Sequence, residues 1–314
     1  MEAGASALES VEGLKISVIM LTYNREDLVG RAIESILSQS FHDFEFIIVN
    51  NGSTDRSGAI ADEYADRDTK VRVIHSERGN IGSGRNTGMD ASVGEYITFI
   101  DDDDYAEHDY LEFLLRLVAD NDAEAAICGA ADRVFEEKLI MTAEQAIIEL
   151  LWRKRYTMAF PTKLFHRNLV EDLRFSIEDK HDDIALMYKV LAKARCIAYH
   201  GLPKYTFYRH EGNNSAWTTN HKLLTSETLD EYLRAYRERT QWLSEKFPNS
   251  AAAFRYFEWS FMLSMMEKII RLGIAGCSKQ LGHISQKLKN NLDEFMTGGF
   301  ILEKELRWIE EYLR

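Results

Sequence analysis

Four consecutive aspartates, Asp101, Asp102, Asp103 and Asp104, are the residues of this sequence best suited to chemistry. They follow residues 96–100, an apolar run of β-favouring residues that predicts a buried strand. Two carboxylates about 4 Å apart repel by roughly 4 kcal/mol near a protein surface, so a convergent cluster needs a cation to stay ionised. Oxygen ligands favour Mg²⁺ or Mn²⁺. The alternative is a solvated acidic turn, and the sequence upstream decides between the two.

The residues before this cluster alternate between strand and helix patterns. Apolar runs at 15–21, 44–50 and 71–75 predict strands, and helical patterns follow at 25–40, from 54 to about 66, and at 87–92. This alternation indicates right-handed crossovers and a mostly parallel sheet with helices on both faces. The fold class is therefore α/β.

Polar residues stand at the end of every predicted strand. Thr22, Tyr23 and Asn24 end the first, residues 50–53 end the second, and a glycine-rich loop at 76–86 follows the third. Ligands of such sheets bind beyond the carboxyl ends of the strands. Glycines in that loop would allow the backbone to approach a bound phosphate closely.

Composition excludes several classes of protein. The chain has 314 residues, 45% of them hydrophobic, a formal net charge of −13 and a pI near 5.2. This charge argues against binding of nucleic acid and against a polybasic membrane anchor, both of which need clustered Lys and Arg. The cysteines, Cys128, Cys196 and Cys277, show no metal-ligand spacing and suit reduced thiols in a cytoplasmic protein.

The two ends of the chain have different characters. Residues 1–14 lack the basic and apolar regions of a signal peptide and predict a disordered tail. No apolar stretch reaches the roughly 18 residues of a membrane span. Residues 218–314 predict a separate region of three to five helices, in which a stripe of Trp259, Phe261, Met262, Met265 and Met266 is interpreted as core.

The order of motifs is more specific than any single motif. The segments VIMLTYNR, IIVNNGSTD, GNIGSGRNTGMDASVGEYITFIDDDDY, HDDIALMYKVLAKARCIAY and YTFYRHEGNNS resemble those of the inverting family 2 glycosyltransferases with the GT-A (Rossmann-like) fold. The resemblance covers residues 16–217. It implies a nucleotide-sugar-binding half at 15–125 and an acceptor-binding half at 126–217, followed by the α-helical region.

The resemblance also assigns the donor site. It implies that Thr22, Tyr23 and Asn24 line the nucleoside, with Tyr23 stacked on the base. Asn51 stands where the family generally has an aspartate that accepts the N3 proton of uracil, so uracil specificity is weakened. Arg85 matches an arginine that pairs with donor phosphate or holds the aspartate cluster.

The aspartate cluster fits the family's DxD pattern. By resemblance, Asp103 ligates Mn²⁺ or Mg²⁺, and Asp101 holds ribose or a metal-bound water. Asp102 fills a position that is often Ser or Ala in the family, and Asp104 follows as a supporting or sugar-facing residue.

A general base is expected at the start of a later helix. Asp183 is the candidate, with Asp182 in the place of the family's Glu, because this pair directly precedes the helical pattern IALMYKVLAKA. The pair Glu178 and Asp179 is the alternative. Arg209 and His210 match an element that would steady the departing diphosphate, and Trp217 is a candidate platform for the acceptor.

The predicted activity is metal-dependent, inverting transfer of a hexose or N-acetylhexosamine from a nucleotide-sugar, a UDP-sugar by resemblance, to a hydroxyl of a glycan, polysaccharide or glycolipid. Two alternatives stay open: a non-catalytic nucleotide-sugar-binding module, and a nucleotidyltransferase, which normally has a basic, glycine-rich signature after its first strand. Peripheral contact with the inner face of the cell membrane and self-association through the C-terminal helices are also left open.

Overall fold

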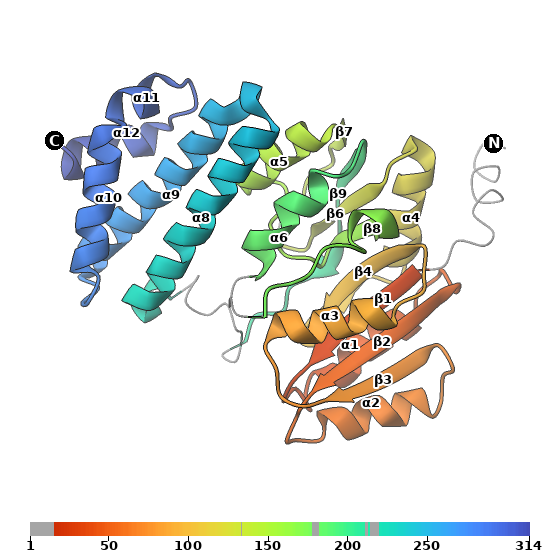
Figure 1. Cartoon of the computed structure of the whole chain (residues 1–314). Helices are drawn as coiled ribbons and strands as arrows, with labels where there is room; N and C mark the ends of the chain where they lie inside the picture. Colours follow the sequence, from red (N-terminus) through yellow and green to blue (C-terminus); the bar gives the residue numbers. More distant parts are fainter. Residues whose placement is uncertain (1–15, 133, 178–181, 211–212, 214–219) are drawn as a thin grey trace. The chain divides into compact units, whose positions relative to one another are not determined.

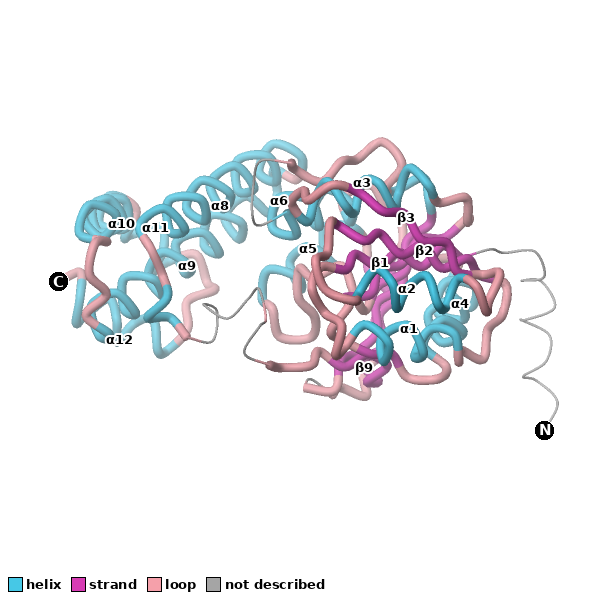
Figure 2. Tube along the Cα trace, turned by 90° about the horizontal axis from the view of Figure 1, so that it is seen from below, coloured by secondary structure: helices cyan, strands magenta, loops and turns pink. Residues whose placement is uncertain are grey.

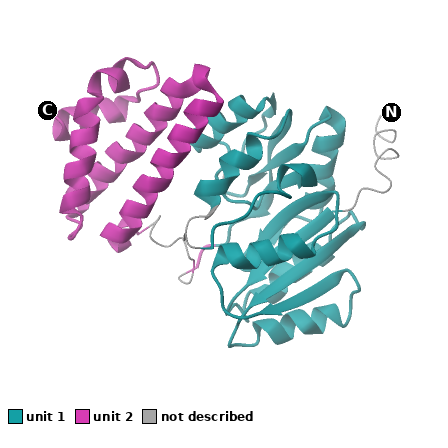
Figure 3. Ribbon diagram, in the orientation of Figure 1, with its two compact units in different colours: residues 1–208 teal, residues 209–314 magenta. Residues whose placement is uncertain are grey.

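The computed structural model describes residues 16–132, 134–177, 182–210, 213 and 220–314. It divides the chain into two compact units, residues 1–208 and 209–314 (Figure 3). The sequence interpretation placed the end of the catalytic domain at 217. The first unit is an α/β unit and the second is helical.

The N-terminal half of the first unit is a parallel sheet. Its strands are β1 (Ile16–Thr22), β2 (Phe44–Asn51), β3 (Val71–Ser76) and β4 (Tyr96–Asp101), arranged in the order β3-β2-β1-β4 (Figure 1). In register, Thr22 pairs with Asn50, Leu21 with Asp101 and Asn51 with Ser76. The carboxyl ends of the four strands therefore meet at one edge, as the polar strand ends predicted.

Helices cover both faces of this sheet. Helix α1 (Val29–Leu37) and helix α2 (Ser57–Ala65) lie on one face and helix α3 (Ile81–Ala91) on the other (Figure 2). The buried side chains of α1, Val29, Ala32, Ile33 and Ile36, recur at helical spacing, so they form one apolar stripe toward the sheet.

The second half of this unit makes the sheet mixed. Its elements are β5 (Tyr105–Ala106), α4 (Tyr110–Asn121), β6 (Ala125–Ala130), β7 (Lys138–Met141), α5 (Ala143–Trp152), β8 (Lys163–His166), the 3₁₀ turn η2 (Arg167–Leu169), α6 (Asp182–Leu191) and β9 (Ile197–Thr206). Strand β8 runs antiparallel between β4 and β6, whereas β9 is parallel to β6. The predicted fold class is confirmed.

The glycine-rich segment differs from its sequence interpretation. Helix α3 begins at Ile81, with the Asn80 side chain accepting a hydrogen bond from Ser83 N, rather than at the predicted residue 87. Gly82, Gly84 and Gly88 thus lie inside a helix. A Cβ at Gly84 would lie 2.1 Å from Leu21 Cδ1, and one at Gly88 2.4 Å from Ile19 Cγ2. These glycines allow the helix to pack closely on β1.

The second unit is built around one long helix. It comprises η3 (His221–Leu223), α8 (Ser226–Lys246), η4 (Pro248–Ser250), α9 (Ala251–Leu272), α10 (Ser278–Asn290), α11 (Leu292–Thr297) and α12 (Glu303–Tyr312). Helix α9 contacts α8, α10, α11 and α12. Trp259, Met262, Met265 and Met266 on α9 are buried, which confirms their interpretation as core, whereas Phe261 is only partly buried and stacks on Tyr236. Among the described residues, no helix is long and apolar enough to cross a membrane.

We predict opposite effects for two glycine-to-alanine substitutions in helices. Gly88→Ala should lower the free energy of unfolding by about 1–3 kcal/mol, because its methyl group would overlap the buried Ile19. Gly282→Ala, in α10, meets no atom within 4 Å and should raise it by about 0.5–1 kcal/mol through helix propensity. Urea unfolding of both variants tests this; a Gly88→Ala protein as stable as Gly282→Ala contradicts it.

Candidate active site

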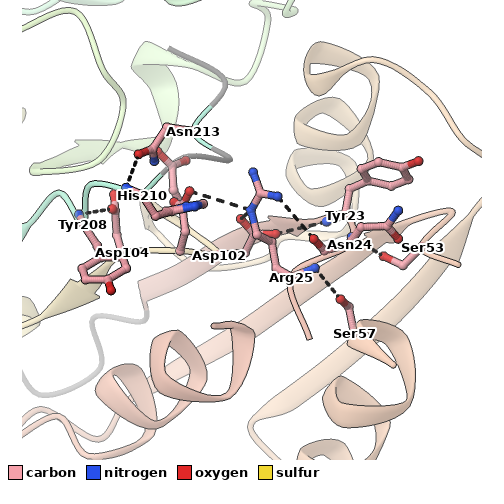
Figure 4. Close-up of polar contacts among 12 residues, drawn as sticks. Tyr23, Asn24, Arg25, Ser53, Ser57, Asp102, Asp104, Tyr208, His210 and Asn213 are labelled. Carbon is pink, nitrogen blue, oxygen red and sulfur yellow. Dashed lines mark hydrogen bonds and ion pairs between the residues drawn. The ribbon is translucent and has the colours of Figure 1, made fainter. Parts of the chain in front are cut away.

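The site lies at the carboxyl ends of β1, β2, β3 and β4, where the predicted polar residues come together. Thr22, Asn51 and Asp101 are the last residues of their strands, and Tyr23 and Asn24 begin the turn after β1. Asn24 has a positive φ of 51°, and its backbone N–H donates to Ser53 Oγ at 3.2 Å, so it ties the turns after β1 and β2 together (Figure 4).

The aspartates after β4 have different surroundings. Asp102 Oδ2 accepts a hydrogen bond from Tyr23 N at 3.1 Å, which joins the end of β4 to that of β1 (Figure 4). Asp104 is buried and accepts hydrogen bonds from the Tyr205 hydroxyl and from Tyr208 N, both at 2.8 Å. Asp101 has a side chain 42% exposed. Asp101 is thus the more accessible carboxylate, while Asp102 and Asp104 hold the loop.

Burial of this cluster opposes its ionisation. Desolvation, followed by the charge of Asp103, raises the pKa of Asp102 to about 7. Desolvation, followed by the charge of Asp101, raises the pKa of Asp104 to about 8. Ionised carboxylates here therefore destabilise the folded protein near neutral pH, and a nearby cation would reduce that effect.

Arg85 links the aspartate cluster to the predicted base. Its guanidinium donates to Asp183 Oδ1 at 2.6 Å and lies 3.4 Å from Asp101 Oδ1. Arg85 is buried, and Phe99, Phe160 and Phe175 surround its guanidinium at 5.3–6.0 Å from their ring centroids. A hydrogen bond to an ionised partner strengthens in such surroundings. Asp183, 98 positions further along the chain, is thereby placed at the same site as Asp101.

Asp182 and Asp183 are the first two residues of α6, so the helix begins with the predicted pair rather than directly after it. The side chain of Asp183 is 30% exposed, so it can meet a substrate. Glu178, Asp179 and Trp217 lie outside the described residues.

Two residues assigned to the leaving group belong to the second unit. Arg209 is exposed, and His210 N donates to Asn213 Oδ1 at 2.6 Å (Figure 4). Their approach to a donor therefore stays a prediction.

Sequence reasoning missed two arginines that offset the cluster's charge. Arg25 Nε lies 3.8 Å from Asp102 Oδ1 and from Asp103 Oδ2, and Arg31 donates to the backbone oxygen of Asp103 at 2.6 Å. Arg25 directly follows the Thr22, Tyr23 and Asn24 motif, which was the available signal. Arg31 stands on α1 between Gly30 and Ala32, and nothing in its sequence context indicates that it contacts Asp103.

A fully buried lysine was missed as well. Lys163 on β8 donates to Ala159 O at 2.5 Å. Burial lowers the pKa of Lys163 to about 8, although the charge of Asp183 acts to raise it. Its sequence context, FPTKLFH, is that of an ordinary strand.

The carboxylates suit a metal ion that is held partly by the protein and partly by the phosphates of a substrate. Within the described ranges, no three His, Cys, Asp or Glu side chains converge as a ready-made metal cage. Mg²⁺ is typically held by one or two carboxylates together with substrate phosphates, and Mn²⁺ accepts the same oxygen ligands. Burial, followed by neighbouring carboxylates, raises the pKa values of Asp102 and Asp104, and a nearby cation would favour their ionised forms, so the residues present fit a divalent cation that arrives with a diphosphate.

The model of glycosyl transferase family 2 matches residues 17–193, which include the ends of β1 to β4 and the start of α6, whereas β9 lies beyond the match. The chain belongs to this family. The predictions of a family 2 glycosyltransferase and of an enzyme are thus confirmed, and the nucleotidyltransferase alternative is excluded.

Several bacterial proteins are similar in sequence to this glycosyltransferase. A putative glycosyltransferase, EpsH of Bacillus subtilis (strain 168), is 32% identical over 210 residues, which make up 62% of this chain and 61% of EpsH. EpsJ of the same organism, an uncharacterized glycosyltransferase, is 36% identical over 185 residues, 51% of this chain and 53% of EpsJ. The match therefore spans less than two thirds of these relatives.

Solved structures share the fold over most of the chain. TarS 1-349 of S. aureus in complex with UDP-GlcNAc matches with a TM-score of 0.60 at 20% identity, covering 94% of this chain and 92% of that one. The mannosyltransferase PcManGT of Pyrobaculum calidifontis, in complex with GDP-Man and Mn²⁺, matches with a TM-score of 0.54 at 16% identity, covering 95% and 84%. These matches establish the GT-A fold for this glycosyltransferase.

We predict that this glycosyltransferase becomes less stable as pH rises from about 5 to 8.5, in proportion to the ionisation of Asp102 and Asp104. Their pKa values are raised, so between pH 4 and 8 the folded protein binds more protons than the unfolded chain, and stability falls with rising pH. In thermal melts, the Tm of Asp102→Asn minus that of wild type should increase as pH rises. Mg²⁺ should raise the Tm of wild type more at pH 8.5 than at pH 6.

The control for this experiment is Asp120→Asn, at an exposed position of α4. Its Tm should follow that of wild type at every pH. Parallel pH curves for wild type and Asp102→Asn would contradict the prediction.

Proposed function

We propose that this family 2 glycosyltransferase transfers a hexose or N-acetylhexosamine from a UDP-sugar to an acceptor hydroxyl, with inversion at the anomeric carbon. The observation that carries the proposal is the Arg85 guanidinium, which pairs with Asp101 on one side and Asp183 on the other. One arginine thus holds a donor-side carboxylate and a candidate base within a single site.

Asp183 is the proposed general base. Its carboxylate is partly exposed, and the hydrogen bond to Arg85 fixes its orientation. It would take the proton from the acceptor hydroxyl as that oxygen attacks the anomeric carbon in line with the leaving diphosphate. A base placed in this way contributes roughly 10²- to 10⁴-fold to the rate. Asp182, at the preceding position, is proposed to support it.

Asp103 and Asp101 are the proposed ligands of Mn²⁺ or Mg²⁺. When bound, the divalent ion offsets the charge that develops on the diphosphate leaving group. Arg25 contacts the side chain of Asp103 and Arg31 its backbone, so these arginines fix the position of the loop that would receive the ion. The Mn²⁺ in the PcManGT complex supports this assignment.

Thr22, Tyr23 and Asn24 are proposed to form the nucleoside end of the site, since they follow β1 beside the aspartate loop. The UDP-GlcNAc in the TarS complex supports a UDP-sugar donor. Residues 15–125 would then bind the donor and residues 126–217 the acceptor, a glycan, polysaccharide or glycolipid. Arg209 and His210 are proposed to steady the departing diphosphate.

The base is tested with Asp183→Asn, which keeps an oxygen to accept the Arg85 hydrogen bond but removes the basic group. Turnover should fall by about 10²-fold or more, while UDP binding measured by calorimetry stays within about twofold of wild type. Glu171→Gln, at an exposed position outside the site, is the matched control. Turnover of Asp183→Asn at the wild-type rate would remove Asp183 from the role.

The metal ligand is tested with Asp103→Asn. Wild type should bind UDP more tightly in Mn²⁺ than in EDTA, because the ion links the carboxylates to the diphosphate. The variant should lose most of this difference in a calorimetric titration. An undiminished Mn²⁺ effect in Asp103→Asn would show that other residues bind the ion.

A further inference from the structure

The loop between β3 and α3 is clamped by the turn after β2. Asn51 Oδ1 accepts a hydrogen bond from Gly79 N at 3.0 Å, and Asn51 Nδ2 donates to Gly79 O at 2.9 Å. Gly52 has a φ of +74°, and a Cβ there would lie 2.7 Å from Arg78 N. The backbone at Arg78 and Gly79 is therefore held by a side chain and by a close approach that only glycine permits.

This clamp leaves Asn51 little capacity to bind a ligand. The residue is 2% exposed, and both hydrogen-bonding groups of its amide are used by one residue of the loop. A carboxylate at the same position could accept from Gly79 N but could not donate to Gly79 O. The amide at position 51 thus matches the loop backbone, which gives a structural reason for asparagine at this position.

The clamp sets the position of Arg78. The Arg78 guanidinium carbon lies 3.1 Å from the ring centroid of Tyr23, so it covers one face of that ring. Across the described part of the chain, no carboxylate lies within ion-pair distance of Arg78, although Arg78 is exposed in an acidic protein. Its described partner is the aromatic ring.

The spacing decides where a base could stack. Stacked aromatic rings have centroids about 4.5–7 Å apart, so the 3.1 Å gap admits no ring between Arg78 and Tyr23. A nucleobase that stacks on Tyr23 without displacing Arg78 must use the opposite face.

We propose that Arg78 is a donor-positioning residue. Its guanidinium covers one face of the Tyr23 ring, and the nucleobase stacks on the other face. Asn51 acts by holding the backbone of Gly79 and not by binding the base. This inference rests on the proposed nucleotide-sugar donor. Stacking on an aromatic ring tolerates every base. Because the Asn51 amide is bonded to Gly79, position 51 contributes nothing to discrimination between uracil and guanine.

The test measures UDP and GDP dissociation constants by calorimetry in Mn²⁺, together with donor KM and kcat. Arg78→Ala should weaken both nucleotides by about 3- to 10-fold and raise KM with kcat unchanged, because Arg78 orders the ring and does not touch the reacting atoms. Arg67→Ala, which removes an exposed arginine that follows α2, is the matched control and should behave as wild type. Unchanged or tighter binding by Arg78→Ala overturns the proposal.

Two further variants separate the roles. Arg78→Lys should stay as weak as Arg78→Ala, because an ammonium lacks the planar stack; full recovery would assign Arg78 to phosphate and overturn the stacking role. Asn51→Asp should weaken UDP and GDP by similar factors, so that their ratio stays within about twofold of wild type. A selective gain for UDP would show that position 51 contacts the base and would overturn the proposal.

The wild-type measurement separates this inference from the proposed function. Wild type that binds neither nucleotide and transfers no sugar from a UDP-sugar contradicts the proposed function. Wild type that binds UDP, with an Arg78→Ala variant that binds it equally well, contradicts only the role of Arg78.

Discussion

The pairing of Arg85 with Asp183 and Asp101 is the interaction on which the site depends. Two carboxylates from distant parts of the chain share one guanidinium, which is buried among three aromatic rings. Because Arg85 keeps its charge throughout the pH range of proteins, its burial stays favourable only while these partners remain. These ion pairs hold the start of α6 at the strand ends.

Burial and mutual repulsion oppose ionisation of the aspartates at the strand ends. Arg25 and Arg31 contact the aspartate loop, yet burial still raises the pKa values of Asp102 and Asp104 to about 7 and 8. A divalent cation beside these carboxyls would favour their ionised forms. Among the described residues the carboxylates form no closed metal cage, which is compatible with the proposed arrival of the ion together with the donor diphosphate.

The glycines around the site serve close packing. Gly84 and Gly88 allow α3 to lie on β1, and Gly52 allows the loop after β3 to approach the turn after β2. The sequence interpretation assigned the glycine-rich segment to phosphate binding, because a glycine-rich loop and a glycine-rich helix face have the same composition. The short distances that a Cβ at Gly84 or Gly88 would have to Leu21 and Ile19 identify a packed helix face and not a phosphate loop.

The sequence by itself determined the α/β class, the family and the strand ends that carry Thr22, Asn51 and Asp101, because buried strands and helical stripes leave local periodic patterns. It also placed Asp183 at the start of a helix. Only the tertiary structure showed that Arg85 joins Asp183 to Asp101, and that Asn51 is committed to Gly79. These contacts connect residues far apart in the chain, and their energy depends on burial and distance, which no local pattern encodes.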